Sequence, residues 1–255
     1  MITATSRSSP AATRVRSVSA GSVRTVELRG PAGRLEAVVN EGSPLAAYAA
    51  VVCHPHPLGG GTFHNKVVYH AMKAMNAPEW GLGWPVLRFN FRGTGLSQGV
   101  HDGAAESADV LAALRWLENE YKLPLVVTGF SFGAAMSLTA CCGKGSPTPR
   151  NTKIRALAAI GLPLRSGPVR PDAPVYDYSF LANCRIPKLF LSGDRDQFAT
   201  QTELIQAVAA AAEPKHVALV PGADHFFTGQ LEAMQSVLST WLKEQVYDPG
   251  QRPCI

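Results

Sequence analysis

Short apolar runs alternate with amphipathic stripes along most of this chain, and that alternation constrains the fold more than any other feature. An apolar run over residues 47–53 precedes a helical stripe over 66–75, and a second apolar run follows over 84–91. Continuous apolar strands are typical of a sheet covered on both faces, and parallel strands need long crossover connections, usually helices. The pattern therefore predicts a parallel β-sheet between two helical layers.

The same order continues toward the end of the chain. The predicted helices cover 108–121, 132–142, 202–212 and 231–246, and the predicted strands cover 123–130, 154–160, 187–192 and 216–220. Ahead of them, residues 22–29 and 34–40 flank the turn sequence Gly-Pro-Ala-Gly, which predicts an antiparallel hairpin. Residues 161–185, with four prolines, break the rhythm and are expected to form an irregular loop or a small cap. The predicted class is α/β, with a mostly parallel, doubly wound sheet.

Length and charge bound the organisation and the partners of the chain. With 255 residues, 46% of them hydrophobic, we expect one domain over 22–246 with polar tails at 1–21 and 247–255. Of the net charge of +5, residues 1–29 supply +4, because five arginines there face one glutamate. The rest of the chain lacks the basic excess of a nucleic-acid-binding protein, so no nucleic acid is expected as a partner.

Hydropathy predicts where the protein resides. No apolar run reaches the roughly 18–20 residues that a membrane span requires, and the N-terminus lacks the apolar core of a secretory signal. We expect a cytoplasmic protein without a membrane span. The alternative is targeting to an organelle through the first 20 residues, which are rich in Arg and Ser and free of acids.

The five cysteines are Cys53, Cys141, Cys142, Cys184 and Cys254. Their spacing fits no paired metal-ligand motif, so we interpret them as buried or incidental thiols in a reducing compartment. No metal or other cofactor is expected.

A candidate nucleophile lies where a predicted strand meets a predicted helix. Gly129, Ser131 and Gly133 form the pattern G-x-S-x-G between the apolar run 123–130 and the small-residue helix 132–142. A serine on such a sharp turn is held in a strained conformation, and the flanking glycines allow close backbone approach. Ser131 is therefore predicted to present its hydroxyl at the carboxyl edge of the sheet.

Together with other motifs, this turn resembles the α/β-hydrolase superfamily, and in particular its small, minimally lidded, largely bacterial serine hydrolases. The likeness covers nearly all of residues 22–246. Its motifs are HPHP at 54–57, followed by GGG and HNK, then NFRGTGLSQG at 90–99, GFSFG at 129–133 and GADHFF at 222–227. The resemblance implies the α/β-hydrolase fold and catalysis by a serine nucleophile.

An acid and a base are expected after the serine in the chain order of that superfamily. Asp194 and Asp196 both follow the strand at 187–192, and the spacing of similar hydrolases selects Asp196 as the orienting acid. His225, after the last predicted strand, is assigned as the general base. Asp224 is interpreted as a loop carboxylate or helix cap.

Two backbone N–H groups are expected to form an oxyanion hole. One is that of Phe132, directly after the nucleophile. In the loop after 47–53 the prolines have no N–H, which leaves His54, His56 and Leu58, and alignment with the superfamily selects His56. The H-x-H spacing of His54 and His56 also allows a zinc site, as in metal-dependent hydrolases.

The remaining histidines and the glycine-rich segment are given no catalytic role. His70 and His216 are expected to pack or to be exposed, and His101 lies in a polar loop. Residues 90–99 lack the GK[ST] ending of a phosphate-binding loop, so they are interpreted as a structural turn beside the site.

The predicted activity is hydrolysis of small-molecule carboxylic esters with small or medium acyl groups, through an acyl-enzyme on Ser131. The same residues could instead serve a peptidase, a thioesterase or an acyltransferase, because a triad does not specify the leaving group. A nonenzymatic protein of the hydrolase fold and a metal hydrolase remain as further alternatives. The sequence does not determine the oligomeric state.

Overall fold

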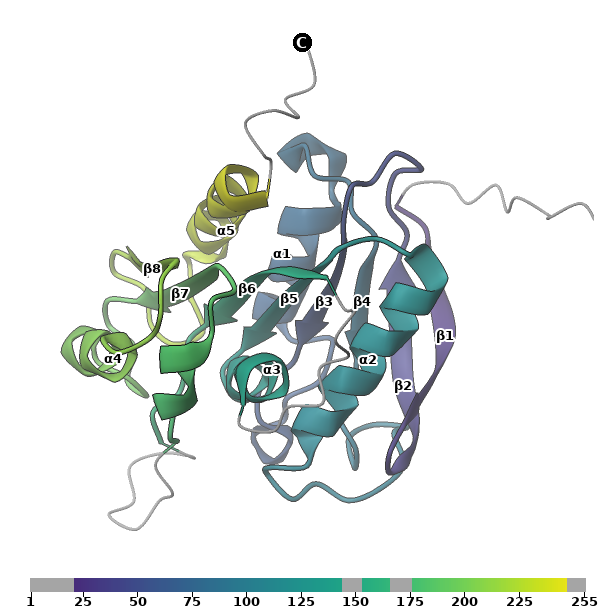
Figure 1. Ribbon diagram of the computed structural model, residues 1–255, viewed down its shortest axis with the longest axis horizontal. Helices are drawn as coiled ribbons and strands as arrows, with labels where there is room; N and C mark the ends of the chain where they lie inside the picture. The colour runs from purple at the N-terminus through teal and green to yellow at the C-terminus, as the bar shows by residue number, and fades with distance from the viewer. Residues whose placement is uncertain (1–20, 144–152, 166–175, 247–255) are drawn as a thin grey trace, which may run out of the picture.

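The protein forms one eight-stranded sheet with helices on both faces (Figure 1). The computed structural model describes residues 21–143, 153–165 and 176–246. The strand order is β1-β2-β4-β3-β5-β6-β7-β8. The β1–β2 and β2–β4 pairs are antiparallel and all other pairs are parallel. The predicted class, a mostly parallel sheet with an N-terminal hairpin, is confirmed.

The elements follow the predicted order. The strands are β1 Val23–Gly30, β2 Gly33–Asn40, β3 Ala49–Cys53, β4 Val86–Phe89, β5 Leu125–Phe130, β6 Ile154–Ile160, β7 Lys188–Gly193 and β8 Lys215–Val220. The helices are α1 Lys66–Asn76, α2 Glu106–Tyr121, α3 Phe132–Cys142, α4 Gln201–Val208 and α5 Leu231–Val246, with the short 3-10 helices η1 Pro57–Gly59, η2 Pro78–Trp80 and η3 Ser179–Asn183.

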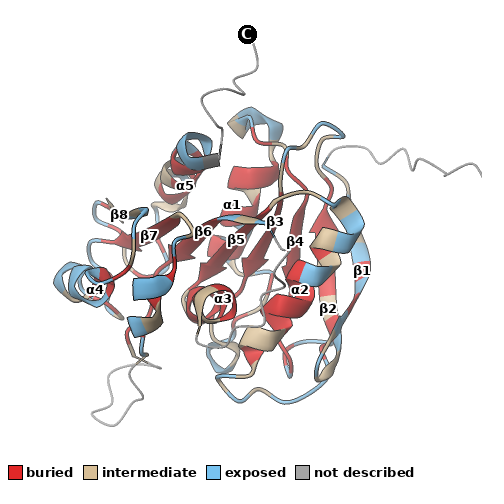
Figure 2. Ribbon diagram, in the orientation of Figure 1, coloured by how far each residue is buried: buried red, intermediate tan, exposed pale blue. Residues whose placement is uncertain are grey.

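Two apolar layers lie on opposite faces of the sheet, and β3 contributes to both. Ala49, Val51 and Cys53 pack into the layer under α2 and α3. Ala50 and Val52 face the other layer, which holds the apolar residues of α1 and α5. Because successive side chains of a strand point to opposite faces, every residue of β3 is buried, and the central strands are buried throughout (Figure 2).

Some boundaries differ from the predicted ones. The apolar run 84–91 forms a strand only over Val86–Phe89. The Asn90 N–H still bonds to the Glu36 carbonyl of the neighbouring strand β2, but the next N–H, that of Phe91, bonds to the His54 ring. Helix α4 ends at Val208, four residues before its predicted end. In the predicted loop or cap, 166–175 lie outside the described residues, as do 1–20 and 247–255 of the predicted tails.

The interpretation of all cysteines as free thiols is wrong for one pair. Cys142, at the end of α3, forms a disulfide with Cys184, which follows η3. The two are 42 positions apart, and only the packing of η3 against α3 brings them together, so their spacing gave no signal. Among the described residues, Cys53 and Cys141 are buried and form no disulfide, and Cys254 lies outside the described residues.

The helices of the described ranges contain no segment that is both long and apolar enough to cross a membrane.

Candidate active site

Ser131 lies on a sharp turn between β5 and α3. Its backbone has φ 54° and ψ −121°, a conformation that a residue with a side chain rarely adopts. The flanking glycines make this turn possible: a Cβ on Gly129 would lie 2.2 Å from the Gly133 carbonyl oxygen, and a Cβ on Gly133 would lie 2.4 Å from that of Cys53. The turn therefore needs glycine on both sides of the serine.

Ser131, His225 and Asp196 form one chain of polar contacts. Ser131 Oγ lies 3.0 Å from His225 Nε2, and His225 Nδ1 lies 2.8 Å from Asp196 Oδ2. An ionised carboxylate can only accept hydrogen bonds, so Nδ1 carries the ring proton and donates a hydrogen bond to Asp196. Nε2 is then left with a lone pair directed at the serine hydroxyl, and this is the tautomer that a general base needs.

Asp196 is buried and held by several donors. Its Oδ1 accepts the N–H groups of Phe198 and Ala199 at 2.8 and 3.3 Å, and its Oδ2 accepts the Ser192 hydroxyl at 3.0 Å. Asp194 is exposed and accepts the Gly222 N–H at 2.7 Å instead, so it does not contact His225. The structure thus places Asp196, and not Asp194, against the histidine.

Asp224 also faces away from the histidine ring. It accepts the N–H groups of Phe226 and Thr228, and these bonds lower the pKa of its carboxyl group. This is the turn-capping position expected for it.

The His225 ring is 2% exposed and lies among aromatic side chains. The ring centroids of Phe198 and Phe130 lie 4.3 and 5.0 Å from its own. Gly161, directly after β6, has φ +54°, and a Cβ there would lie 3.1 Å from His225 Cε1. No local sequence pattern indicated Gly161 as a neighbour of His225, because the contact joins two loops that are 64 positions apart.

The loop after β3 lies beside the start of α3. The ring centroids of His56 and Phe132 are 5.0 Å apart. Among the described residues, neither the N–H of His56 nor that of Phe132 has an acceptor. Both remain available for an incoming oxygen.

His54 has a different environment from His56. Its Nδ1–H donates to the Pro55 carbonyl at 2.7 Å, and its Nε2 accepts the Phe91 N–H at 2.9 Å. Burial of the ring lowers its pKa to about 4. Both nitrogens are therefore engaged, which disfavours the alternative of a zinc site on His54 and His56. In the described part of the chain, no three His, Cys, Asp or Glu residues are grouped to hold a metal ion.

Comparison with known proteins assigns the family. The family model described as an alpha/beta hydrolase domain matches residues 56–243. The chain belongs to the α/β-hydrolase family. This α/β hydrolase is also 34% identical over 225 residues to an uncharacterized protein of Rickettsia prowazekii, covering 85% of this chain and 87% of that one.

Two solved structures are similar over nearly their whole length. One is an alpha-beta serine hydrolase homologue from Coxiella burnetii, with a TM-score of 0.71, 30% identity, and coverage of 86% of this chain and 97% of that one. The other, from Xanthomonas campestris, is described as a serine hydrolase without a lid, with a TM-score of 0.69, 26% identity, and coverage of 89% and 97%. The hydrolase assignment rests on both sequence and fold.

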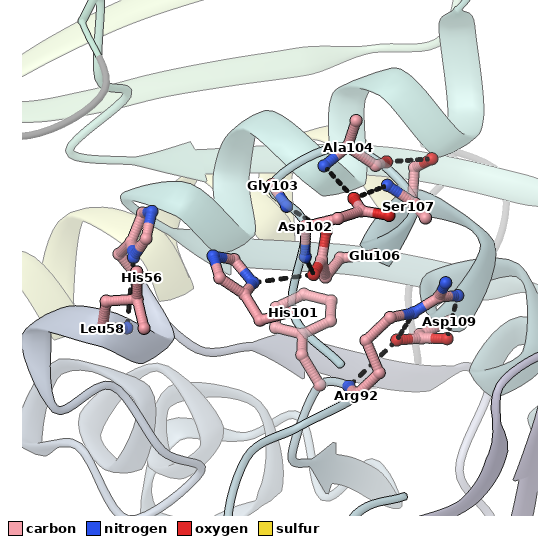
Figure 3. A network of polar contacts seen from close by, with 12 residues as sticks. His56, Leu58, Arg92, His101, Asp102, Gly103, Ala104, Glu106, Ser107 and Asp109 are labelled. Atoms are coloured by element: carbon pink, nitrogen blue, oxygen red, sulfur yellow. Dashed lines mark hydrogen bonds and ion pairs between the residues drawn. The ribbon is translucent and has the colours of Figure 1, made fainter. Parts of the chain in front are cut away.

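A second polar network adjoins the site of this α/β hydrolase, and no sequence motif indicated it (Figure 3). His101 Nδ1 lies 2.7 Å from Oε1 of the fully buried Glu106, in a contact that is not an aligned hydrogen bond. Asp109, also in the first turn of α2, accepts two side-chain hydrogen bonds from Arg92. His101 lies in a loop as predicted, but its ring packs against His56 and Phe132.

Proposed function

We propose that this α/β hydrolase cleaves carboxylic esters of small or medium acyl groups through an acyl-enzyme on Ser131. The observation that carries the proposal is the chain of contacts Ser131 Oγ–His225 Nε2–Asp196 Oδ2, with successive distances of 3.0 and 2.8 Å. A serine hydroxyl is a weak nucleophile at neutral pH and needs a base that is itself oriented by a third group. These three side chains supply the set.

In the acylation step, Ser131 Oγ attacks the ester carbonyl carbon while its proton passes to His225 Nε2. Asp196 accepts the Nδ1–H and stabilises the imidazolium that forms. Negative charge develops on the former carbonyl oxygen, where the N–H groups of His56 and Phe132 would bind it. When the tetrahedral intermediate collapses, the bond to the alcohol oxygen breaks, and His225 returns its proton to that oxygen.

Deacylation repeats these steps with water. His225 Nε2 takes a proton from the water as its oxygen attacks the acyl carbonyl. The second tetrahedral intermediate then expels Ser131 Oγ, which recovers its proton from the imidazolium. The acid leaves and the free enzyme is restored, so the cycle requires only the chain's own groups and water.

The chain between nucleophile and acid supports an open site. In the described residues between α3 and β7, the regular elements are β6 and the short helix η3. Only a small cap can be built from what remains, and the similar Xanthomonas structure is described as having no lid. We therefore expect p-nitrophenyl esters of short and medium chains to be preferred over long-chain ones, measured as kcat/KM across a chain-length series.

A fluorophosphonate probe tests the nucleophile directly, because it phosphonylates only an activated serine. We expect a stable adduct on Ser131, located by peptide mass spectrometry, and loss of both adduct and esterase activity in Ser131→Ala. Ser137→Ala is the control, since Ser137 is a buried serine within α3, six residues further along the chain. Esterase activity that survives in Ser131→Ala would refute the proposal.

The choice between the two aspartates has its own test. Asp196→Asn retains the shape of the side chain but can present an amide to His225 Nδ1, so we expect kcat to fall by about 10³–10⁴-fold. Asp194→Asn retains the oxygen that accepts the Gly222 N–H, so turnover should change little. Equal losses in the two variants would contradict the assignment of Asp196.

The other acyl-transfer reactions share this mechanism and differ in the leaving group. Parallel assays with ester, thioester and peptide substrates, with and without added acceptor alcohols, separate esterase from thioesterase, peptidase and acyltransferase. Esterase activity that persists after stringent chelation would set aside a metal hydrolase. A folded protein that neither labels nor turns over any of these substrates would instead favour a nonenzymatic role.

A further inference from the structure

The His56 loop, residues 54–61 after β3, must be held in place if the His56 N–H is to act in an oxyanion hole. Donors of such a hole act only when they are fixed near the position of the developing charge. His56 lies in a loop between two prolines, and its ring is partly exposed. Within the loop, its Nδ1 accepts the Leu58 N–H at 3.2 Å and its carbonyl accepts the Gly61 N–H at 3.1 Å.

From outside the loop, two rings bracket the His56 side chain. The ring of Phe132 lies at 5.0 Å and that of His101 at 4.8 Å, the latter edge-on at 77°. His101 also contacts Phe132, at 5.4 Å. Phe132 is fixed because it begins α3, whereas His101 belongs to a loop and needs an anchor of its own.

Glu106 provides that anchor (Figure 3). It is fully buried in the first turn of α2, where its carboxylate accepts the N–H groups of Asp102 and Gly103 at 2.9 and 3.0 Å. The same carboxylate contacts His101 Nδ1 at 2.7 Å. A negative charge at a helix N-terminus is favourable, and here it ties the His101 loop to a rigid element.

We propose that His101, held by Glu106, is a positioning residue that fixes the His56 loop. The arrangement resembles that of His225 and Asp196, because in both a buried carboxylate contacts Nδ1 of a histidine, although the Glu106 contact lacks the alignment of a hydrogen bond. The difference lies in what the ring contacts, because His101 packs against His56 and Phe132 and not against the serine. The catalytic consequence, but not the positioning itself, rests on the proposed function.

Two variants of His101 separate the two parts of its role. His101→Phe retains a ring that can pack against His56 but has no nitrogen for Glu106. His101→Asn retains an N–H donor near the position of Nδ1 but has no ring. Because the proposed role needs both the ring and the nitrogen, each variant should loosen the His56 loop. In the His101→Phe background the contact with Glu106 is already lost, so adding Glu106→Gln should cause little further change.

The direct readout is amide hydrogen exchange by NMR. We expect the Leu58 and Gly61 amides, both bonded to His56, to exchange at least about threefold faster in each His101 variant. We also expect kcat for a short p-nitrophenyl ester to fall by about 10-fold, a fraction of the loss for removing a donor, with KM nearly unchanged. His70→Phe is the control, since His70 on α1 also has a polar partner at Nδ1, Gln235 at 2.8 Å, but lies outside this network.

Wild-type exchange of both amides in either folded His101 variant would overturn the inference, whatever happens to kcat. Faster exchange with an unchanged kcat would overturn its catalytic part. Failure of the proposed function has a different signature: the wild type would neither turn over esters nor label at Ser131. The exchange rates would still decide whether His101 positions the loop.

Discussion

At the scale of single residues, the site depends on conformations that few side chains tolerate. Ser131 has a positive φ, and the backbone of its neighbours passes within contact distance because Gly129 and Gly133 lack a Cβ. Such strain persists only where the surrounding structure enforces it. Strand β5 before the serine and helix α3 after it provide that enforcement, so the hydroxyl is directed before substrate arrives.

Gly161 also leaves room by lacking a Cβ, in this case beside the proposed base His225. We expect Gly161→Ala to lower kcat by about 10-fold with little change in KM, because its methyl group would displace the His225 ring from Ser131. Gly81→Ala is the matched control: Gly81 also has a positive φ, of +74°, but a Cβ there meets only the end of the Lys243 side chain. Both variants should lose about 1 kcal/mol of stability from backbone strain. Equal kcat values would exclude displacement of the ring.

The sequence predicted those site residues that follow strands in a fixed chain order. Ser131, Asp196 and His225 could be assigned because each follows an apolar run and their order matches the family. Gly161 and His101 could not, since each reaches the candidate site through a contact between separate loops that no local pattern encodes. The disulfide of Cys142 with Cys184 was missed for the same reason.

At the scale of elements, the N-terminus of α2 organises the long connection from β4. Glu106 and Asp109, in its first turn, are both fully buried. Glu106 holds the end of the connection at Asp102 and Gly103, and Asp109 holds its beginning by accepting the Arg92 N–H. A connection fixed at both ends presents His101 in one place.

Removing one member of a buried ion pair leaves the other charge buried without a partner, so we expect Asp109→Ala to be strongly destabilising. The Arg92 and Asp109 side chains are 10% and 0% exposed and lie 2.7 Å apart. Urea denaturation should show a loss of about 3 kcal/mol or more. Glu27→Ala, which breaks the exposed pair with Arg29, should change stability by less than about 0.5 kcal/mol. Similar losses for both would mean that the buried pair contributes no more than a surface one.

Element boundaries were predictable where local signals suffice. Helices 132–142 and 231–246 and strand 154–160 begin and end as predicted. The strand over 84–91 was predicted too long, because the Phe91 N–H bonds to the His54 ring and not to a neighbouring strand. Hydropathy does not show whether a backbone N–H will bond to a neighbouring strand or to a side chain elsewhere in the fold.

At the scale of the whole molecule, the parallel sheet gathers the site at one edge. His56, Ser131, Asp196 and His225 follow β3, β5, β7 and β8, whose carboxyl ends meet there because all these strands are parallel. The apolar layers on both faces keep the strands in register. Residues separated by up to 169 positions are thereby placed within one site.

The same dense packing makes the stability of the molecule depend on pH through His54. Burial lowers its pKa from 6.5 to about 4, so between these values the unfolded chain binds more protons than the folded one. The stabilisation is complete above pH 6.5 and is lost as pH falls toward 4, an effect of about 3 kcal/mol at most. Urea denaturation at several pH values should show a shallower dependence in His54→Gln than in the wild type. His64→Gln, which removes an exposed histidine, should retain the wild-type dependence; identical slopes in the wild type and His54→Gln would contradict this account.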